Sequence, residues 1–464
     1  MSVVKNPIFL ITTLAEYQTV FWLEVGLELR RTGREAAFIS FDDRSTMLLR
    51  QAGFETFSAK QEELAADQAT FDATVARFQM SDLNFWLLHE RLTFAISDEQ
   101  ELRRKLLAYL ALAERACLTL KQRGHSVTMV QELGGFISVI ASFFAARLHG
   151  IDNWFLEPAF FRGRMFFLKN SFAALDVGAS LPEQVSSEVQ AYLTATLQSG
   201  QIVVPQKDRH QYTTAFKKII NIKNAKRLSV KVVDKYILRK HQEFGYLGHY
   251  VSIHMRMLVN SMRMRKIYTE LEQIGPFVYY PLHVPGDMAL TLRSSEYLDQ
   301  VALIAYLARI VPHTHKIVIK EHPAMIGAID AGKILELLSV YDNVHVLPPS
   351  TNNYQVLRAA DAIVSVNSKS GAEAALLGKP VFVLGDAFYR GSPLVVPIEK
   401  LSTLPGLLKQ ALLNPSHAGV TDSDKVSRYF ELVWSHCFVG ELYITDPRNI
   451  AQFTDSLIAV TIVD

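Results

Sequence analysis

AIVSVNSKSGAEAALLGKPVFVL, residues 362–384, is the stretch that decides the fold of this chain. Its beginning, Ala362–Val366, is almost wholly apolar and predicts a buried strand. A helix is predicted over Gly371–Leu377 and a second buried strand over Pro380–Leu384. Because a single helix joins them, the two strands are expected to run parallel in one sheet.

The same alternation extends along both halves of the chain. Apolar runs predict further strands at Ile8–Thr12, Ala36–Ser40, Thr128–Gln131, Trp154–Glu157, Phe277–Leu282, Lys316–Lys320 and Val344–Leu347. Helical periodicity lies between them, at Tyr17–Arg31, Ser45–Ala52, 62–123, Phe136–His149, Ser295–Arg309, Ala331–Ser339 and Tyr354–Ala360. This pattern predicts an α/β protein with two doubly wound parallel sheets that face each other, with ligands held between the carboxyl ends of their strands.

The chain has 464 residues, enough for two domains. We predict an N-terminal domain over residues 1–265 and a C-terminal domain over residues 266–440. A helix within residues 441–464 is expected to pack back on the body. Residues 181–265 are polar and basic with helical periodicity, which predicts a helical region inserted in the N-terminal domain.

Basic residues are concentrated in residues 207–266, which carry 15 Lys and Arg against three acids, although the whole chain has a net charge of only +2. Such a block can meet an anionic membrane surface, a nucleic acid or an anionic substrate, or it can be a solvated helical face. Two distant cysteines and the lack of a leader or a membrane-spanning apolar run predict a cytoplasmic protein. Peripheral contact with the inner membrane through this block stays open.

An anion site is predicted where the first strand of the quoted stretch gives way to its helix. Backbone N–H groups at the helix start, the hydroxyls of Ser368 and Ser370 and the Lys369 amine can bind phosphate. Gly371 would let the phosphate approach the backbone closely. The alternative is that Ser370 only caps the helix.

A second motif, Lys320-Glu321-His322-Pro323, follows the strand Lys316–Lys320 directly. His322 can donate to a phosphate from the strand end, and Pro323 fixes the turn that presents it. His283 also follows a strand and can contact the donor phosphate or the reacting sugar. A purely structural histidine is the alternative for both residues.

These motifs resemble those of the capsule polysaccharide biosynthesis family, which includes retaining β-Kdo glycosyltransferases. The resemblance rests on His322-Pro323, on the segment PSTNNYQVLRAAD at 349–361, on VNSKSGAEAALLGKPV at 366–381 and on YYPLHVPGD at 279–287. It implies a GT-B fold, CMP-β-Kdo as the donor substrate, no metal or other cofactor, and retention of configuration. Bacterial sialyltransferases share His-Pro and serine motifs in a similar order.

The resemblance also points to a carboxylate in the first half, Glu157. It lies among aromatic side chains at a predicted strand end, where burial would raise its pKa and suit a general acid/base. This chain has Glu-Pro-Ala where the family often has Glu-Asp-Gly, which leaves the nucleophile unassigned by this motif. A surface glutamate before a turn is the alternative.

Asp234 is the remaining candidate for the nucleophile, because it is the only acid between Arg209 and Gln242 and bases surround it. Nearby cations would keep it ionised, as a carboxylate nucleophile requires. An ordinary ion pair on a helix surface is equally consistent with the pattern.

Together these features predict a retaining transferase that moves β-Kdo from CMP-β-Kdo to a bacterial surface glycan, O-antigen or capsule, by double displacement. The expected partners are the CMP-sugar and a glycan acceptor, lipid-linked or not, and no nucleic acid. The alternatives are an inverting sialyltransferase-like enzyme with another CMP-sugar, and a non-catalytic protein that binds glycans or nucleic acids.

Overall fold

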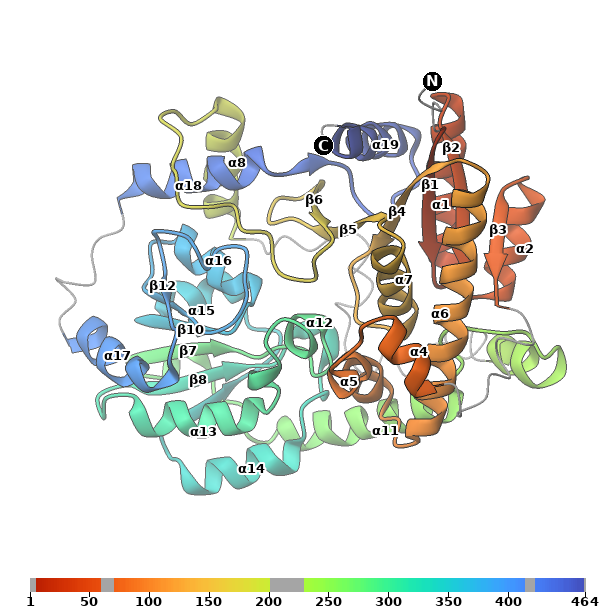
Figure 1. Cartoon of the computed structure of the whole chain (residues 1–464). Helices are drawn as coiled ribbons and strands as arrows, with labels where there is room; N and C mark the ends of the chain where they lie inside the picture. Colours follow the sequence, from red (N-terminus) through yellow and green to blue (C-terminus); the bar gives the residue numbers. More distant parts are fainter. Residues whose placement is uncertain (1–5, 60–70, 201–228, 414–421, 463–464) are drawn as a thin grey trace.

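The computed structural model describes residues 6–59, 71–200, 229–413 and 422–462, and it contains two separate sheets with helices packed on both (Figure 1). The expected α/β architecture with two Rossmann-like, GT-B-type halves is confirmed. Within the described ranges, no helix is both long and apolar enough to cross a membrane.

The first sheet has the strand order β13-β6-β5-β4-β1-β2-β3. The five strands β5, β4, β1, β2 and β3 run parallel to one another, whereas β6 is antiparallel to both β5 and β13. Its strands are β1 (Pro7–Thr13), β2 (Glu35–Ser40), β3 (Glu55–Ser58), β4 (Ser126–Glu132), β5 (Asp152–Pro158), β6 (Arg164–Lys169) and β13 (Phe438–Val439). Its helices are α1 (Glu16–Arg31), α2 (Asp43–Gln51), α4 (Phe71–Arg77), α5 (Leu83–Phe94), α6 (Glu99–Gln122) and α7 (Ile137–Leu148). Helix α7 is almost wholly buried, which explains its unbroken apolar sequence.

The second sheet is parallel throughout and has the order β12-β11-β10-β7-β8-β9. Its strands are β7 (Phe277–Pro281), β8 (Lys316–Lys320), β9 (Val344–Leu347), β10 (Ala362–Ser365), β11 (Val381–Val383) and β12 (Val396–Pro397). Its helices are α12 (Met288–Thr291), α13 (Gln300–Ile310), α14 (Ala331–Val340), α15 (Asn353–Ala359), α16 (Lys369–Leu376) and α17 (Leu404–Leu413).

The helix predicted over Ser295–Arg309 is wrong at its start. A short 3-10 turn, Ser295–Tyr297, comes first, and α13 begins only at Gln300. The Asp299 side chain accepts a hydrogen bond from the backbone N–H of Ala302 and so caps α13.

The predicted helical region 181–265 is shared between the two halves. Of its residues, 201–228 lie outside the described ranges; the rest includes α8 (Ser187–Ser199), the π-helix η3 (Val233–Ile237) and α11 (Leu247–Met264). Helix α8 packs on α18 (Ser423–Ser435), and its buried side chains belong to the core of the second sheet. Helix α11 contacts both α5 and α14.

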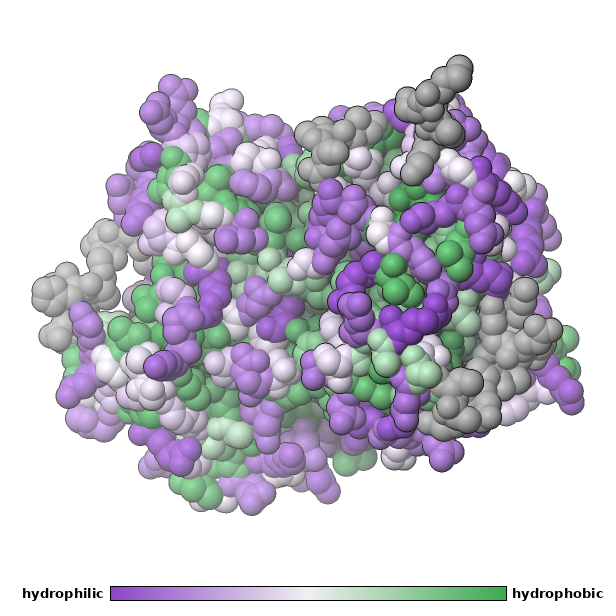
Figure 2. Space-filling model, viewed as in Figure 1, coloured by the Kyte–Doolittle hydropathy of each residue, from purple (hydrophilic) through white to green (hydrophobic). Residues whose placement is uncertain are grey.

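The chain returns to the first half at its C-terminal end. Strand β13 pairs with β6, and α19 (Pro447–Ile462) packs on α1, where the Phe453 ring meets those of Phe21 and Trp22 edge-on (Figure 1). Figure 2 shows hydrophilic side chains over much of both halves in this view and hydrophobic ones showing between them near their boundary.

Candidate donor site at the carboxyl edge of the second sheet

Three neighbouring strands bring the predicted donor residues to one edge of the second sheet. Strands β10, β7 and β8 lie side by side and parallel, so their carboxyl ends meet at the same edge. His283 follows β7, His322 follows β8, and Ser368 follows β10. The structure therefore gathers these three sequence-predicted residues, as expected for a ligand site of an open α/β sheet.

Two lysine amines beside this edge share one buried carboxylate, that of Glu373. Burial lowers the pKa of Lys320 to about 8 and that of Lys369 to about 8, while the nearby Glu373 carboxylate partly offsets both shifts. Burial raises the pKa of Glu373 itself. The two amines lie close enough to Glu373 to affect its charge, and a pair of cationic side chains at a strand edge can attract an anionic ligand.

A chain of side-chain hydrogen bonds holds Glu373 and Ser370 in place. The Asn353 amide nitrogen donates to Glu373 Oε2 at 2.8 Å and to Ser370 Oγ at 3.0 Å. The Tyr279 hydroxyl donates to Asn353 Oδ1 at 3.1 Å and so fixes the orientation of the amide. Asn353, in the segment 349–361, was not predicted as a site residue.

The two histidines differ in their hydrogen-bond partners. His322 Nδ1 accepts a hydrogen bond from the backbone N–H of Ala324 at 3.2 Å, so the neutral ring carries its proton on Nε2 and can donate from there. Burial is the main cause that lowers the pKa of His283 to about 4; the nearby Asp287 opposes this shift and His322 adds to it. His283 Nε2 is buried and has no hydrogen-bond partner among the described residues.

The start of helix α16 differs from the prediction at two residues. The cap is Ser368, whose hydroxyl accepts from the N–H of Ser370 at 3.2 Å, so the alternative role of Ser370 as the cap is wrong. Gly371, where a close approach of phosphate was predicted, makes contacts within the protein. Its N–H donates to the Ser368 carbonyl, and a Cβ there would lie 2.2 Å from the Tyr389 hydroxyl. The absence of a side chain at Gly371 makes room for Tyr389.

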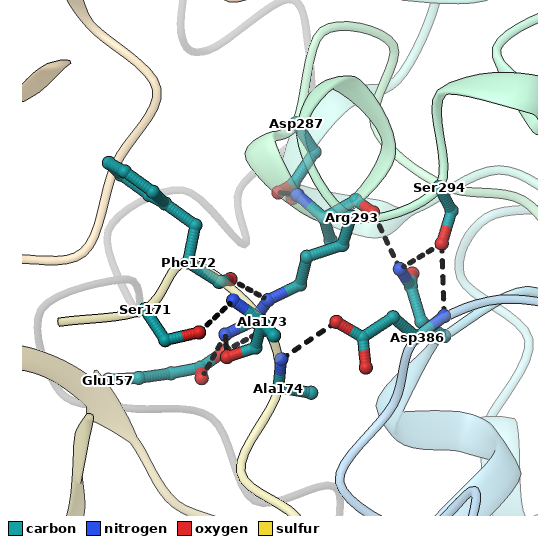
Figure 3. A network of polar contacts seen from close by, with 11 residues as sticks. Glu157, Ser171, Phe172, Ala173, Ala174, Asp287, Arg293, Ser294 and Asp386 are labelled. Carbon is teal, nitrogen blue, oxygen red and sulfur yellow. Dashed lines mark hydrogen bonds and ion pairs between the residues drawn. The ribbon is translucent and has the colours of Figure 1, made fainter. Parts of the chain in front are cut away.

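Glu157 pairs with Arg293, an arginine of the second half that the sequence analysis missed. Both carboxylate oxygens accept from the guanidinium at 2.8 Å, and Arg293 Nε donates to the Phe172 carbonyl at 2.7 Å (Figure 3). The guanidinium thus occupies both carboxylate oxygens, where the sequence predicted a carboxyl among aromatic side chains. A lone arginine in a loop offered no signal by which to find it.

Two more hydrogen bonds join the first and second halves. We call the boundary where these contacts and the Glu157–Arg293 pair lie the seam. Asp386 Oδ2 accepts from the N–H of Ala174 at 2.8 Å (Figure 3). His89 of α5 and Thr291 of α12 are joined by a 2.9 Å hydrogen bond between Nδ1 and Oγ1. The two halves are thus tied together beside the donor residues.

Asp234 is ionised as predicted, but the structure places it away from the donor residues. Its carboxylate accepts from Arg44 at 2.6 and 3.2 Å, and this pair lowers the pKa of Asp234, with Lys240 adding to the effect. Arg44 belongs to α2, next to β2 and β3 at the edge of the first sheet opposite β5 and β6 (Figure 1). The structure therefore does not bring Asp234 to the edge that carries His283, His322 and Ser368.

A buried ionic group in the first half also escaped the sequence analysis. Lys105 contacts both Glu90 and Glu243, and the Tyr246 hydroxyl donates to Glu90 at 2.6 Å. Glu90 Oε2 accepts from the N–H of Ile137, which satisfies the start of α7. The sequence did not single out these acids, because Glu90 lies in a charged helical stretch and Glu243 in the basic block.

The chain belongs to the capsule polysaccharide biosynthesis protein family, whose match covers residues 138–396. It is 26% identical over 197 residues to the protein FixF of Sinorhizobium fredii (strain NBRC 101917 / NGR234), a match to 42% of this chain and 46% of that protein. The chain thus spans about half the length of this curated relative.

Two solved structures show a remote similarity to this chain. The β-Kdo 2,7 transferase KpsC of Thermosulfurimonas dismutans has a TM-score of 0.36 and 14% identity, over 81% of this chain and 96% of that chain. HepE of Anabaena, solved with UDP-glucose, has a TM-score of 0.33 and 14% identity, over 98% and 99%. Likenesses this remote carry no argument about the reaction. Among the described residues, no group of three or more His, Cys, Asp or Glu is placed to hold a metal ion.

Proposed function

We propose that this protein is a glycosyltransferase that takes β-Kdo from CMP-β-Kdo and transfers it, with retention, to a bacterial surface glycan. The observation that carries the proposal is the pair of lysine amines, Lys320 and Lys369, that share one carboxylate where three strands end. Family membership supports a role in polysaccharide assembly. The choice of CMP-β-Kdo comes from the resemblance of the His-Pro and serine motifs.

The site suits a donor with two negative groups, a phosphate and a sugar carboxylate. An anion beside Lys320 and Lys369 favours their protonated forms, so binding and protonation reinforce each other. In the proposed complex, His322 Nε2 and the Ser370 hydroxyl donate to the phosphate. These groups would stabilise the charge that develops on the departing nucleotide without a metal ion.

Retention through double displacement needs a carboxylate nucleophile, and this role stays open. Asp234 is paired with Arg44, and Glu157 with Arg293. Either acid could reach a sugar at the second sheet only after its ion pair opens. His283, whose neutral buried ring has an unpartnered Nε2, is proposed to contact the donor.

Ligand-induced thermal stabilisation tests the donor. CMP and CMP-Kdo are expected to raise the melting temperature more than UDP, GDP or their sugars, because a ligand that binds the native state stabilises it by mass action. Lys320→Ala should remove most of this shift, whereas the matched surface change Lys409→Ala should leave it unchanged. A shift with UDP-sugars alone would refute CMP recognition.

Product analysis tests the reaction. Incubation with CMP-Kdo and glycan acceptors should release CMP and give a β-linked product by NMR. An α-linked product would instead show inversion, as in the sialyltransferase-like alternative. Asp234→Asn with near-normal turnover would remove Asp234 from the nucleophile role.

A further inference from the structure

Helix α11 carries a stripe of hydrophobic side chains that no described part of the chain covers. Its members recur every three or four residues and are 41–53% exposed, which is unusual for large apolar residues at such spacing on a surface helix. We call this set the apolar stripe: Val251, Met255, Val259 and Met262.

The opposite face of α11 is firmly packed. The Asn260 amide donates to the Gly327 carbonyl at 3.0 Å, and a Cβ at Gly327 would lie only 2.1 Å from the Met257 carbonyl oxygen. Asn260, Ser261 and Met264 are buried. The helix is therefore held against the body with the apolar stripe turned outward.

Basic side chains accompany the apolar stripe. We call them the basic flank: Arg256, Arg263, Arg265 and Lys266. They are exposed, and none forms an ion pair with another residue that the structure describes. The sequence from Phe244 to Thr269 contains no acidic residue. At 100° per residue, Arg256 and Arg263 fall on one side of the stripe and Arg265 on the other.

A second exposed apolar group lies in the same basic stretch of the chain. Tyr236, Ile237 and Leu238 are 65%, 71% and 54% exposed at and just after η3. The acid of this segment, Asp234, is turned inward to Arg44.

We propose that the apolar stripe and the basic flank dock this protein onto an anionic lipid bilayer, with α11 lying along the headgroup layer. Exposed aliphatic side chains bordered by bases are the features with which interfacial helices insert and attract anionic headgroups. A second copy of the chain fits poorly, because it would bring like charges together. A nucleic acid fits poorly as well, because the stripe has aliphatic side chains and no aromatic ones for bases to stack on.

The position of α11 makes such docking compatible with both halves. Helix α11 contacts α5 of the first half and α14 of the second. A bilayer on its outer face would thus approach both halves at once, beside the seam that carries His89 and Thr291. The inference does not depend on the identity of the donor sugar.

Co-sedimentation of the whole protein with vesicles tests the proposal. Vesicles of phosphatidylcholine with 30% phosphatidylglycerol should bind the protein, and pure phosphatidylcholine should bind it much less. Arg256→Gln with Arg263→Gln should weaken binding about tenfold or more, since each base near an anionic surface contributes about fivefold. Met255→Ser with Val259→Ser should weaken it about tenfold, in high salt as well as low, because apolar insertion is not screened.

Matched controls keep the test clear of folding effects. Val20→Ser with Leu118→Ser changes exposed apolar residues of α1 and α6, and Lys400→Gln with Lys409→Gln changes exposed bases of the second half. Both should bind like the unchanged protein. If the stripe and flank variants bound anionic vesicles as well as the unchanged protein does, the proposal would be overturned. Two other results would also overturn it. One is no vesicle binding together with salt-sensitive binding to a labelled RNA that only the flank variant loses, which would indicate a nucleic-acid partner. The other is an oligomer of the unchanged protein that becomes monomeric only in the stripe variant, which would indicate a second copy of the chain.

Discussion

At the scale of single residues, the candidate site contains a lysine, Lys320, whose positively charged amine is buried away from water. Lys320 is only 5% exposed, and its amine has no hydrogen bond or ion pair among the described residues, although the charge of Glu373 acts on it. Burying an amine without a partner costs folding free energy, and such groups are found mostly at functional sites. Lys320 is therefore a candidate ligand-binding residue. The hydrogen bond from Asn353 keeps the neighbouring Glu373 carboxylate oriented.

We predict that CMP binds more weakly as the pH rises through 8. The pKa of Lys320 and that of Lys369 are both about 8, so both amines lose their charge above that pH. Binding at pH 8 to 9 should take up protons, because the anion raises both pKa values. Calorimetry in two buffers with different ionisation enthalpies measures this uptake. An affinity that is unchanged between pH 7 and 9 would contradict the prediction.

Gly371→Ala is expected to destabilise the protein by about 1–3 kcal/mol, because the added methyl group would overlap the Tyr389 hydroxyl and ring. Urea unfolding measures the loss. Gly406→Ala in α17 is the matched control, since nothing lies within 4 Å of its Cβ position, and it should be neutral or stabilising. Equal stability of the two variants would show that Tyr389 moves aside without cost.

At the scale of elements, helix α16 separates capping from ligand binding. Ser368 caps the helix, whereas Ser370 receives its hydrogen bond from Asn353. The sequence alone could not assign these roles, because either serine can satisfy the free N–H groups of a first turn. The register of the strand before the helix decides which serine stands at the cap.

We predict opposite effects for the two serines. Ser368→Ala should cost about 1 kcal/mol of stability through loss of the cap. Ser370→Ala should cost less stability but weaken CMP binding several-fold, as expected for one lost hydrogen bond to a charged group. Chemical denaturation and calorimetry on both variants provide the comparison. The reverse order of effects would return Ser370 to a structural role.

At the scale of the whole molecule, a largely buried ion pair is one of the contacts that join the two halves. Arg293 has a side chain only 6% exposed, and its guanidinium joins Glu157 and the Phe172 carbonyl across the seam. Helix α8 follows the first half in the chain but packs on α18 of the second half, and helix α19 follows the second half but packs on α1 of the first. Relative movement of the halves would therefore have to break or repack these contacts.

A double-mutant cycle on Arg293→Ala and Glu157→Gln should give a coupling energy of about 2–3 kcal/mol, because the pair is largely shielded from water. The exposed pair of Arg390 and Glu399 is the matched control, with an expected coupling of about 0.5 kcal/mol or less. Thermal and urea unfolding give the four free energies of each cycle. Equal coupling in the two cycles would mean that the seam is open to solvent in solution.

Local patterns in the chain were enough to determine the alternation of strands and helices, the two-sheet class and the edge where His283, His322 and Ser368 meet. Apolar periodicity reports burial, and parallel strands joined by helices have few arrangements. The strands β12 and β13 have only two residues each, which is too short for a pattern to predict. Only the tertiary structure decided the partners of the acids. Glu157 and Arg293 are 136 residues apart, and Arg44 and Asp234 are 190 apart. No local pattern encodes an ion pair that exists because two distant segments fold against each other.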